Sequence, residues 1–360
     1  MGILRFLLAV AVVIAHSSAI FGFSFVGGQI AVQAFYMISG FYMALILNEK
    51  YVGVNKSYKL FISNRLLRLF PIYWTVLLIV LLYSLVLAIS SHGNNVGEFS
   101  AYKQYYPSMG AGSLVFLVFT NLFLFLQDAV LFLGLDTTSG NLFFTSNFRN
   151  TDPMLYKFLF IPQAWTIGIE VAFYLIAPFI ARRKLNVILV LVALSLMLRI
   201  FLYFGMNLKN DPWTYRFFPT ELVFFLLGIV AYNIYKKLKP VKLEEIYLKV
   251  IWYTLVGFTL FYSFLPFGFK DYLYIVAFFA ALPFIFIYTK SSKRDAYIGE
   301  LSYPIYISHI LVLTFLKFFT LPKAYLGLTL TIVTILFSIL LNELIAKKIE
   351  KIRQKRVVVQ

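Results

Sequence analysis

Residues 69–89 read LFPIYWTVLLIVLLYSLVLAI, a stretch without a single charged side chain. About 20 predominantly apolar residues in a helix cross the hydrocarbon core of a membrane, so this stretch predicts a transmembrane helix. The composition agrees, because 61% of the 360 residues are hydrophobic and only 13% are charged. A soluble domain is about half apolar and about a quarter charged. We therefore predict a membrane protein.

Eleven hydrophobic segments follow one another along the chain, with short connections everywhere except between Ser90 and Phe160. They cover residues 3–21, 29–47, 69–89, 113–134, 161–181, 185–205, 217–235, 248–266, 272–289, 300–319 and 324–346. The expected fold class is all-α, a polytopic integral membrane helical bundle.

Basic residues indicate how many segments cross, because Lys and Arg concentrate in cytoplasmic loops. If all eleven cross from a cytoplasmic N-terminus, the cluster at residues 182–184 and the later clusters lie outside, against that rule. If residues 113–134 enter and leave on one face, 22 of the 32 basic residues lie inside. Asn121, Gln127 and Asp128 in that segment favour a re-entrant stretch over an ordinary crossing helix. We predict ten crossings plus one re-entrant or non-crossing helical segment, with both termini cytoplasmic.

Two properties of the whole chain narrow its chemistry. It has no cysteine, so it forms no disulfide, no thiolate metal site and no acyl-cysteine intermediate. Its formal net charge is +17, which in a soluble protein would suggest nucleic acid but here reports cytoplasmic loops. We expect neither a metal site nor a nucleic-acid partner.

Ionisable side chains are costly inside a membrane, so those within the predicted spans are functional candidates. His16 follows Arg5 by three helical turns, which places both side chains on one helix face about 16 Å apart. An imidazole exchanges protons near neutral pH, and a packing role is the alternative for His16. Glu170 lies mid-span, where a carboxylate is protonated or paired. His16 is one candidate partner and Arg199 is another.

Arg65 and Arg68 stand at the cytoplasmic start of the third predicted span. Their spacing of three residues puts both guanidinium groups on one helix face, where they can clamp a phosphate. A purely topogenic role is the alternative, since basic residues often precede a span, and Tyr73 and Trp74 then fit an interfacial aromatic belt.

Six motifs in sequence order resemble those of the acyltransferase-3 family of multispanning membrane acyltransferases. They are Arg5-x10-His16, Phe35-Tyr36-Met37-Ile38-Ser39-Gly40-Phe41, Arg65-x2-Arg68-Leu69-x-Pro71-x-Tyr73, Trp165-x4-Glu170-x2-Phe173-Tyr174-x3-Pro178, Phe225-x2-Gly228 and Gly299-x2-Ser302-Tyr303-x2-Tyr306-x2-His309. On this resemblance, residues 1–346 form an acyltransferase-3-like transmembrane domain and residues 347–360 a basic cytoplasmic tail. Gly2-Ile3-Leu4 replaces the family's usual Leu-Asp-Gly before the first arginine, and Thr166 replaces a common serine.

The resemblance implies an O-acyltransferase in the inner or plasma membrane. Such an enzyme moves an acyl group, most often acetyl, from cytoplasmic acyl-CoA to a hydroxyl of an extracytoplasmic carbohydrate, such as a surface polysaccharide or its lipid-linked precursor. Acyl-CoA is then a co-substrate, no cofactor is permanently bound, and the other partners are the carbohydrate or glycolipid acceptor and membrane lipid. Because the chain stops at Gln360 without an added hydrolase-like domain, any second step on the acceptor is expected from a separate protein.

The resemblance also assigns roles to residues. His16 and Glu170 are the catalytic candidates: the resemblance implies that Glu170 stands near the chemistry, and from the residue types we expect His16 to remove the acceptor proton and Glu170 to orient or charge-balance the imidazole. Acyl-CoA binding falls to Arg5, Arg65 and Arg68, and Arg5 and His16 line the path of the acyl group. The candidate acceptor site contains Tyr36, Ser39, Trp165, Tyr174 and His309.

Alternatives remain for three of these roles. Direct transfer is favoured because the chain has no cysteine carrier, and an acyl-His or an acyl-Ser39 intermediate is the alternative. Ser39-Gly40 also fits a close-packing site between helices. His309 fits either the acceptor site or simple packing.

Rival functions are a transporter or flippase for a polar lipid or sugar, a membrane-bound O-acyltransferase of another fold, and a scaffold. A transporter would equally place charges and a re-entrant segment along its pathway, but the sequence has no internal repeat and no pair of Gly/Pro-broken helices. A scaffold would not require a buried His and Glu.

Overall fold

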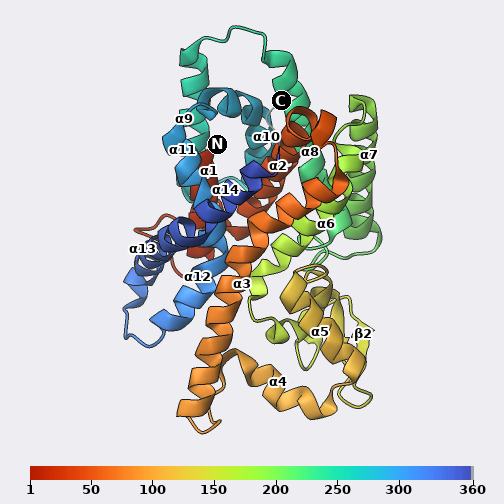
Figure 1. Ribbon diagram of the computed structural model, residues 1–360, viewed down its shortest axis with the longest axis vertical. Coiled ribbons are helices and arrows are strands. Elements are labelled where there is room, and N and C mark those ends of the chain that lie inside the picture. The colour runs from red at the N-terminus through yellow and green to blue at the C-terminus, as the bar shows by residue number, and fades with distance from the viewer. Residues whose placement is uncertain (358–360) are drawn as a thin grey trace. The chain divides into compact units, whose positions relative to one another are not determined.

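α-Helices contain most of the residues that the computed structural model describes, which are residues 1–357 (Figure 1). Their bounds are α1 Gly2–Ala15, α2 Gly27–Glu49, α3 Tyr58–Ser90, α4 Ser100–Tyr105, α5 Ala111–Phe123, α6 Trp165–Ile180, α7 Leu185–Ile200, α8 Phe218–Leu238, α9 Glu245–Phe261, α10 Lys270–Thr289, α11 Lys293–Glu300, α12 Ser302–Leu316, α13 Lys323–Leu341 and α14 Lys347–Lys355. A short antiparallel hairpin, β1 Leu133–Leu135 with β2 Leu142–Phe144, is the one sheet within the described residues. The predicted all-α class is confirmed.

Nine helical stretches within residues 1–357 are long and apolar enough to cross a membrane. They are Gly27–Glu49, Tyr58–Ser90, Pro162–Ile180, Leu185–Gly205, Phe218–Leu238, Glu245–Phe264, Lys270–Thr289, Lys293–Leu316 and Lys323–Lys355. The chain is therefore a multi-pass membrane protein. These stretches coincide with nine of the eleven predicted segments, and the count of ten crossings stays a prediction.

The first predicted segment, residues 3–21, contains a shorter helix than expected. α1 has 14 residues and ends where His16 leaves the helical conformation with φ −97° and ψ 3°. Its length of about 21 Å is less than the core thickness of about 30 Å. Every residue from Leu8 to Ile14 is nevertheless buried by protein. A helix that is apolar on all sides belongs in the interior of a bundle, so neighbouring helices cover it instead of lipid.

The segment predicted at residues 113–134 is not one continuous helix. α5 ends at Phe123, and Leu124 adopts a left-handed φ of 62°. A 3₁₀ turn and β1 follow. The 13 residues of α5 extend about 20 Å, too short for a full crossing. This length favours the predicted non-crossing segment.

The side chain of Asn121 explains why the chain turns after α5. Its amide nitrogen donates to the carbonyl oxygens of Leu117 and Phe158, both at 2.9 Å, and its oxygen accepts from the backbone N–H of Phe160 at 2.8 Å. Buried polar groups need such partners. The polar residue inside this apolar run therefore fastens α5 to the loop that leads into α6.

The chain forms two compact units. The first contains Met1–Arg68, Ile176–Ala193 and Leu222–Gln360, and the second contains Leu69–Leu175 and Leu194–Glu221. In the first unit α1 lies against α2, α11, α12 and α13 (Figure 1). Its core there includes Ala9, Val13, Leu301, Ile305, Val312, Leu316 and Leu330.

Two glycines allow α2 and α8 to cross at backbone contact. A Cβ at Gly40 would lie 1.9 Å from the carbonyl oxygen of Phe225, and one at Gly228 would lie 2.1 Å from the carbonyl oxygen of Met37. The ring of Tyr36 stacks on that of Phe225 beside this crossing, with centroids 4.5 Å apart. Small residues permit such close approach of helices in a membrane. Two of the motifs noted in the sequence therefore meet here and serve packing.

In the second unit a buried ion pair joins the end of α7 to the start of α8. Arg199 Nη1 lies 2.7 Å from Glu221 Oε1, and the Glu221 side chain is fully buried. Arg199 Nη2 also donates to the carbonyl oxygen of Thr214 at 2.7 Å. The intramembrane charge of Arg199 is thus balanced by Glu221, and removing either partner would leave the other as a costly unpaired charge.

Candidate functional site

α1 carries one candidate residue near each end. Arg5 lies in its first turns and His16 is the residue at which it ends. Arg5 belongs to a group of charges near the helix start, because the charges acting on the Tyr42 hydroxyl are those of Arg5, Arg68 and Asp295. The charges of these three residues, from α1, α3 and α11, therefore all act on Tyr42 of α2. The sequence predicted the two cations but not this common neighbour.

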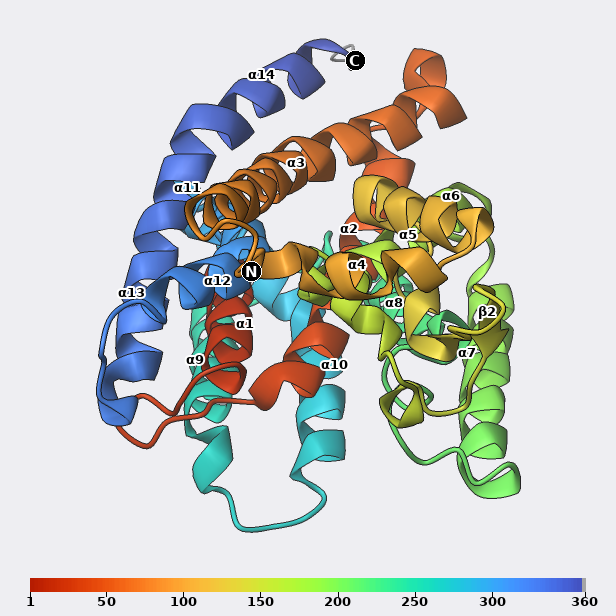
Figure 2. The same cartoon turned by 90° about the horizontal axis from the view of Figure 1, so that it is seen from below.

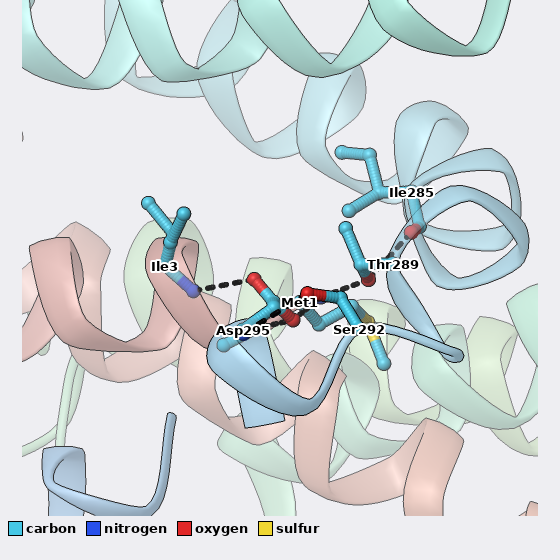
Figure 3. A network of polar contacts seen from close by, with 7 residues as sticks. Met1, Ile3, Ile285, Thr289, Ser292 and Asp295 are labelled. Carbon is cyan, nitrogen blue, oxygen red and sulfur yellow. Dashed lines mark hydrogen bonds and ion pairs between the residues drawn. The ribbon is translucent and has the colours of Figure 1, made fainter. Parts of the chain in front are cut away.

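The start of α1 is held by Asp295 of α11, as Figure 3 shows. The Asp295 carboxylate accepts from the backbone N–H groups of Gly2 at 2.6 Å and Ile3 at 2.9 Å. The amine of Met1 lies 2.8 Å from the same carboxylate and also donates to the Thr289 hydroxyl. Burial lowers the pKa of this amine, and Asp295 opposes that shift. Asp295 thus satisfies free N–H groups of α1 and places a negative charge at the positive end of its dipole.

Asp295 brings a carboxylate to the stretch Gly2-Ile3-Leu4, which itself contains no acid. The two backbones nearly touch there, since a Cβ on Gly2 would lie 1.6 Å from the carbonyl oxygen of Asp295. An acid distant in sequence therefore meets this helix start, which no local motif could reveal.

Asp295→Asn is expected to destabilise the protein. The substitution removes the negative charge and leaves one acceptor oxygen for three donors, and losing a buried cap costs about 1–2 kcal/mol. The measurement is the thermal unfolding temperature of the purified protein. Glu300→Gln is the matched control, because Glu300 is an exposed acid on the same helix. Equal unfolding temperatures for the two variants would contradict the capping role.

At the other end of α1, His16 lies beside His309 of α12. The two ring centroids are 4.9 Å apart and the ring planes are inclined by 53°. His309 is fully buried, whereas His16 is exposed. The two imidazoles that the sequence placed nearly 300 residues apart thus form a single pair, and they belong to the same unit.

Hydrogen bonds set the tautomer of both rings. Nδ1 of His16 lies 2.9 Å from the carbonyl oxygen of Val12, and Nδ1 of His309 lies 2.7 Å from that of Tyr306. A carbonyl oxygen only accepts, so Nδ1 carries the hydrogen in each neutral ring and Nε2 keeps a lone pair. Among residues 1–357, Nε2 of His309 has no hydrogen-bond partner. The pair therefore presents proton-accepting nitrogens.

The candidate residues on α6 belong to the second unit. Tyr174 donates a hydrogen bond of 2.5 Å to Glu170 Oε1, one helical turn away. Trp165 lies under the guanidinium of Arg216, which is 4.4 Å from the ring centroid. Arg216 is held by two bonds to Asp211, of 2.6 and 3.1 Å. α6 therefore presents an acid fixed by a phenol and a tryptophan covered by a cation.

The structure brings some of the predicted site residues together and assigns others to different units. His16 joins His309, Arg5 and Arg68 share the surroundings of Tyr42, and Tyr36 and Ser39 lie on α2 beside the crossing with α8. Glu170, Trp165 and Tyr174 lie in the second unit, whereas His16 lies in the first. The pairing of His16 with Glu170 therefore stays a prediction.

The fold and these residues define a multi-pass helical membrane protein with cations at one end of a buried helix and two imidazoles at the other. Its family follows from comparison: the acyltransferase-3 model, described as an acyltransferase domain, matches residues 1–343. The chain belongs to the acyltransferase-3 family, as its motifs indicated.

Other comparisons add little. An uncharacterized protein of Aquifex aeolicus (strain VF5) is 25% identical over 204 residues, which are 54% of this chain and 89% of that relative. No solved structure matches the chain.

Proposed function

We propose that this acyltransferase moves an acyl group, acetyl in the simplest case, from cytoplasmic acyl-CoA to a hydroxyl of an extracytoplasmic carbohydrate. A surface polysaccharide or its lipid-linked precursor has the required chemistry. Membership of the family supports acyl transfer as the reaction. The identity of the donor, the identity of the acceptor and the direction of transfer across the membrane are what we propose here. The protein would lie in the cell membrane with both termini in the cytoplasm.

The observation that carries the proposal is the order of functional groups along α1, with a cation at its start and imidazoles at its end. Its first turn carries Arg5, whose charge and that of Arg68 both act on Tyr42, and its last residue leads into the imidazole pair, eleven residues and about 16 Å beyond Arg5. An acyl-CoA is arranged in the same order, since a flexible arm separates its phosphates from its thioester. Guanidinium groups bind phosphates and an imidazole accepts a proton, so the two ends of α1 offer what the two ends of the donor require.

The proposed chemistry is a direct transfer. The acceptor oxygen attacks the thioester carbonyl carbon while Nε2 of His16 takes the hydroxyl proton, and the carbon–sulfur bond then breaks. The imidazolium returns its proton to the departing thiolate, so the ring ends neutral. The carbonyl end of α1, where His16 sits, stabilises the transient positive charge. Glu170, Trp165 and Tyr174 belong to the other unit, and their roles in charge balance and acceptor contact stay predictions.

The direct test is transfer of labelled acetyl from acetyl-CoA in membranes that contain the protein. We expect labelled acetyl esters on surface polysaccharide, and none in membranes from cells that lack the gene. A transporter or flippase would give no acetyl esters from labelled acetyl-CoA, and that result would refute the proposal.

Arg68 offers a second measurement, on donor binding. Arg68→Ala is expected to weaken acetyl-CoA binding by about tenfold or more, because a charge-assisted bond to phosphate is lost. Arg68→Lys is expected to weaken it less, since a point charge replaces the fork only in part. Equilibrium dialysis of the purified protein measures both values. Unchanged affinity in both variants would leave Arg68 a topogenic role only.

A further inference from the structure

The basic segment at the end of the described chain folds back onto α3. α13 continues through a π-helical stretch, Asn342–Ala346, into α14. α14 lies against the first turns of α3 (Figure 2). Arg356 fastens it there, donating to the Asn64 side-chain oxygen at 3.0 Å and to the Ser63 hydroxyl at 2.8 Å. This contact lies within the first unit, next in sequence to Arg65 and Arg68.

α14 buries an arginine in preference to an apolar residue. Arg353 is 8% exposed, whereas the adjacent Ile352 is 52% exposed. Nε of Arg353 donates to the carbonyl oxygen of Asn64 at 2.8 Å, and Nη1 pairs with Glu350. Burying a guanidinium costs free energy, and burying Ile352 would gain it. Hydrophobic docking alone therefore does not explain the orientation of this helix.

The charges around Arg353 are unfavourable for it. Its guanidinium is hydrogen-bonded to the carbonyl oxygen of Asn64, the residue before Arg65, and the positive charges of Arg65 and Arg68 both act against its own charge there. Arg65 is itself only 5% exposed. Like charges in a poorly solvated place repel strongly, and a bound anion removes that repulsion. The donor proposed above carries several phosphate charges.

We propose that Arg353 of α14 joins Arg65 and Arg68 in binding the phosphates of the donor. This inference rests on the proposed function and extends it to a residue outside the family match, which ends at residue 343. α14 is then part of the donor site, held in place by Arg356 while Arg353 turns toward the phosphates. Guanidinium groups on two helices contact more phosphate oxygens than the pair on α3 alone, and each contact is charge-assisted.

The test measures acetyl-CoA affinity of the full chain in phosphatidylcholine nanodiscs. Arg353→Gln is expected to weaken binding about tenfold or more. Lys355→Gln is the matched control, because it removes one exposed positive charge from the same helix, and its affinity is expected to stay within about twofold of the wild type. Arg353→Lys keeps the charge but loses the fork, so an intermediate affinity is expected. If Arg353→Gln does not fold, the affinity of Arg353→Lys is compared with that of the wild type instead.

Several outcomes would overturn the inference. Wild-type affinity in both Arg353 variants would remove Arg353 from the donor site while leaving the proposed function intact. Equal weakening by Lys355→Gln would show that only the overall charge of α14 matters. Arg353 variants that bind acetyl-CoA normally but lose anionic lipid from mixed nanodiscs would assign the arginine to a lipid headgroup. A wild-type protein that neither binds acetyl-CoA nor transfers acetyl would refute the proposed function, and this inference with it.

Discussion

His16→Ala is expected to reduce acetyl transfer by at least about 100-fold, because it removes the proton-accepting Nε2 of the imidazole pair. The amount of protein in the membrane should not change, since His16 is exposed and its ring hydrogen-bonds to the carbonyl oxygen of Val12, one turn back in the chain. The measurement is labelled acetyl transfer divided by the amount of membrane protein. A general base that is removed leaves donor binding intact, so acetyl-CoA affinity should also stay near the wild-type value.

His92→Asn is the control for His16. His92 is another histidine of this chain, it lies in a loop at φ 50°, and asparagine tolerates that conformation. Its transfer rate should equal that of the wild type. If His16→Ala lowered the amount of protein rather than the rate per molecule, His16 would be a packing residue and the proposed chemistry would lose its base.

Gly228→Ala is expected to have the largest effect on folding. The new methyl group would lie 2.1 Å from the carbonyl oxygen of Met37 and 2.6 Å from the backbone nitrogen of Phe41, so α2 and α8 would have to separate. Overpacking against backbone falls among the most severe single substitutions, which cost about 4 kcal/mol or more of a total stability of about 5–15 kcal/mol. We expect little or no folded protein by size-exclusion chromatography in detergent.

Gly257→Ala is the matched control, because a Cβ at Gly257 of α9 meets no atom within 4 Å. Alanine favours a helix over glycine by about 1 kcal/mol, so this variant should unfold at the same or a higher temperature. A Gly228→Ala protein as stable as Gly257→Ala would contradict the close crossing and would return Phe225-x2-Gly228 to the list of candidate site motifs.

Much of the helix pattern was predictable from the order of residues. The predicted segment 217–235 corresponds to α8 at Phe218–Leu238, and 272–289 corresponds to α10 at Lys270–Thr289. Both are predominantly apolar runs bounded by charges, and such runs insert according to local hydropathy. The point at which α5 ends was less predictable, because the polar side chain of Asn121 finds its partners inside the protein and the chain then turns within an apolar run.

Some residues of the candidate site were likewise predictable from the sequence, and others were not. Residue type and spacing singled out His16, Arg65 and Arg68, since ionisable groups are conspicuous among apolar residues. The sequence did not identify Asp295 and Arg353 as candidates, because an acid or a base at the edge of a span resembles any loop charge until its partner is known. What the sequence by itself determined is therefore the all-α membrane class, the family and most of the spans, which depend on local composition.

Only the tertiary structure decided which of these residues meet. It placed His309 beside His16, the Asp295 carboxylate on the first N–H groups of α1, and the Arg353 guanidinium on the carbonyl oxygen of Asn64, the residue before Arg65. Each contact joins residues separated by nearly the whole chain. The physical reason is that such meetings depend on how helices pack, through glycine crossings and buried caps whose partners carry no mark in the local sequence.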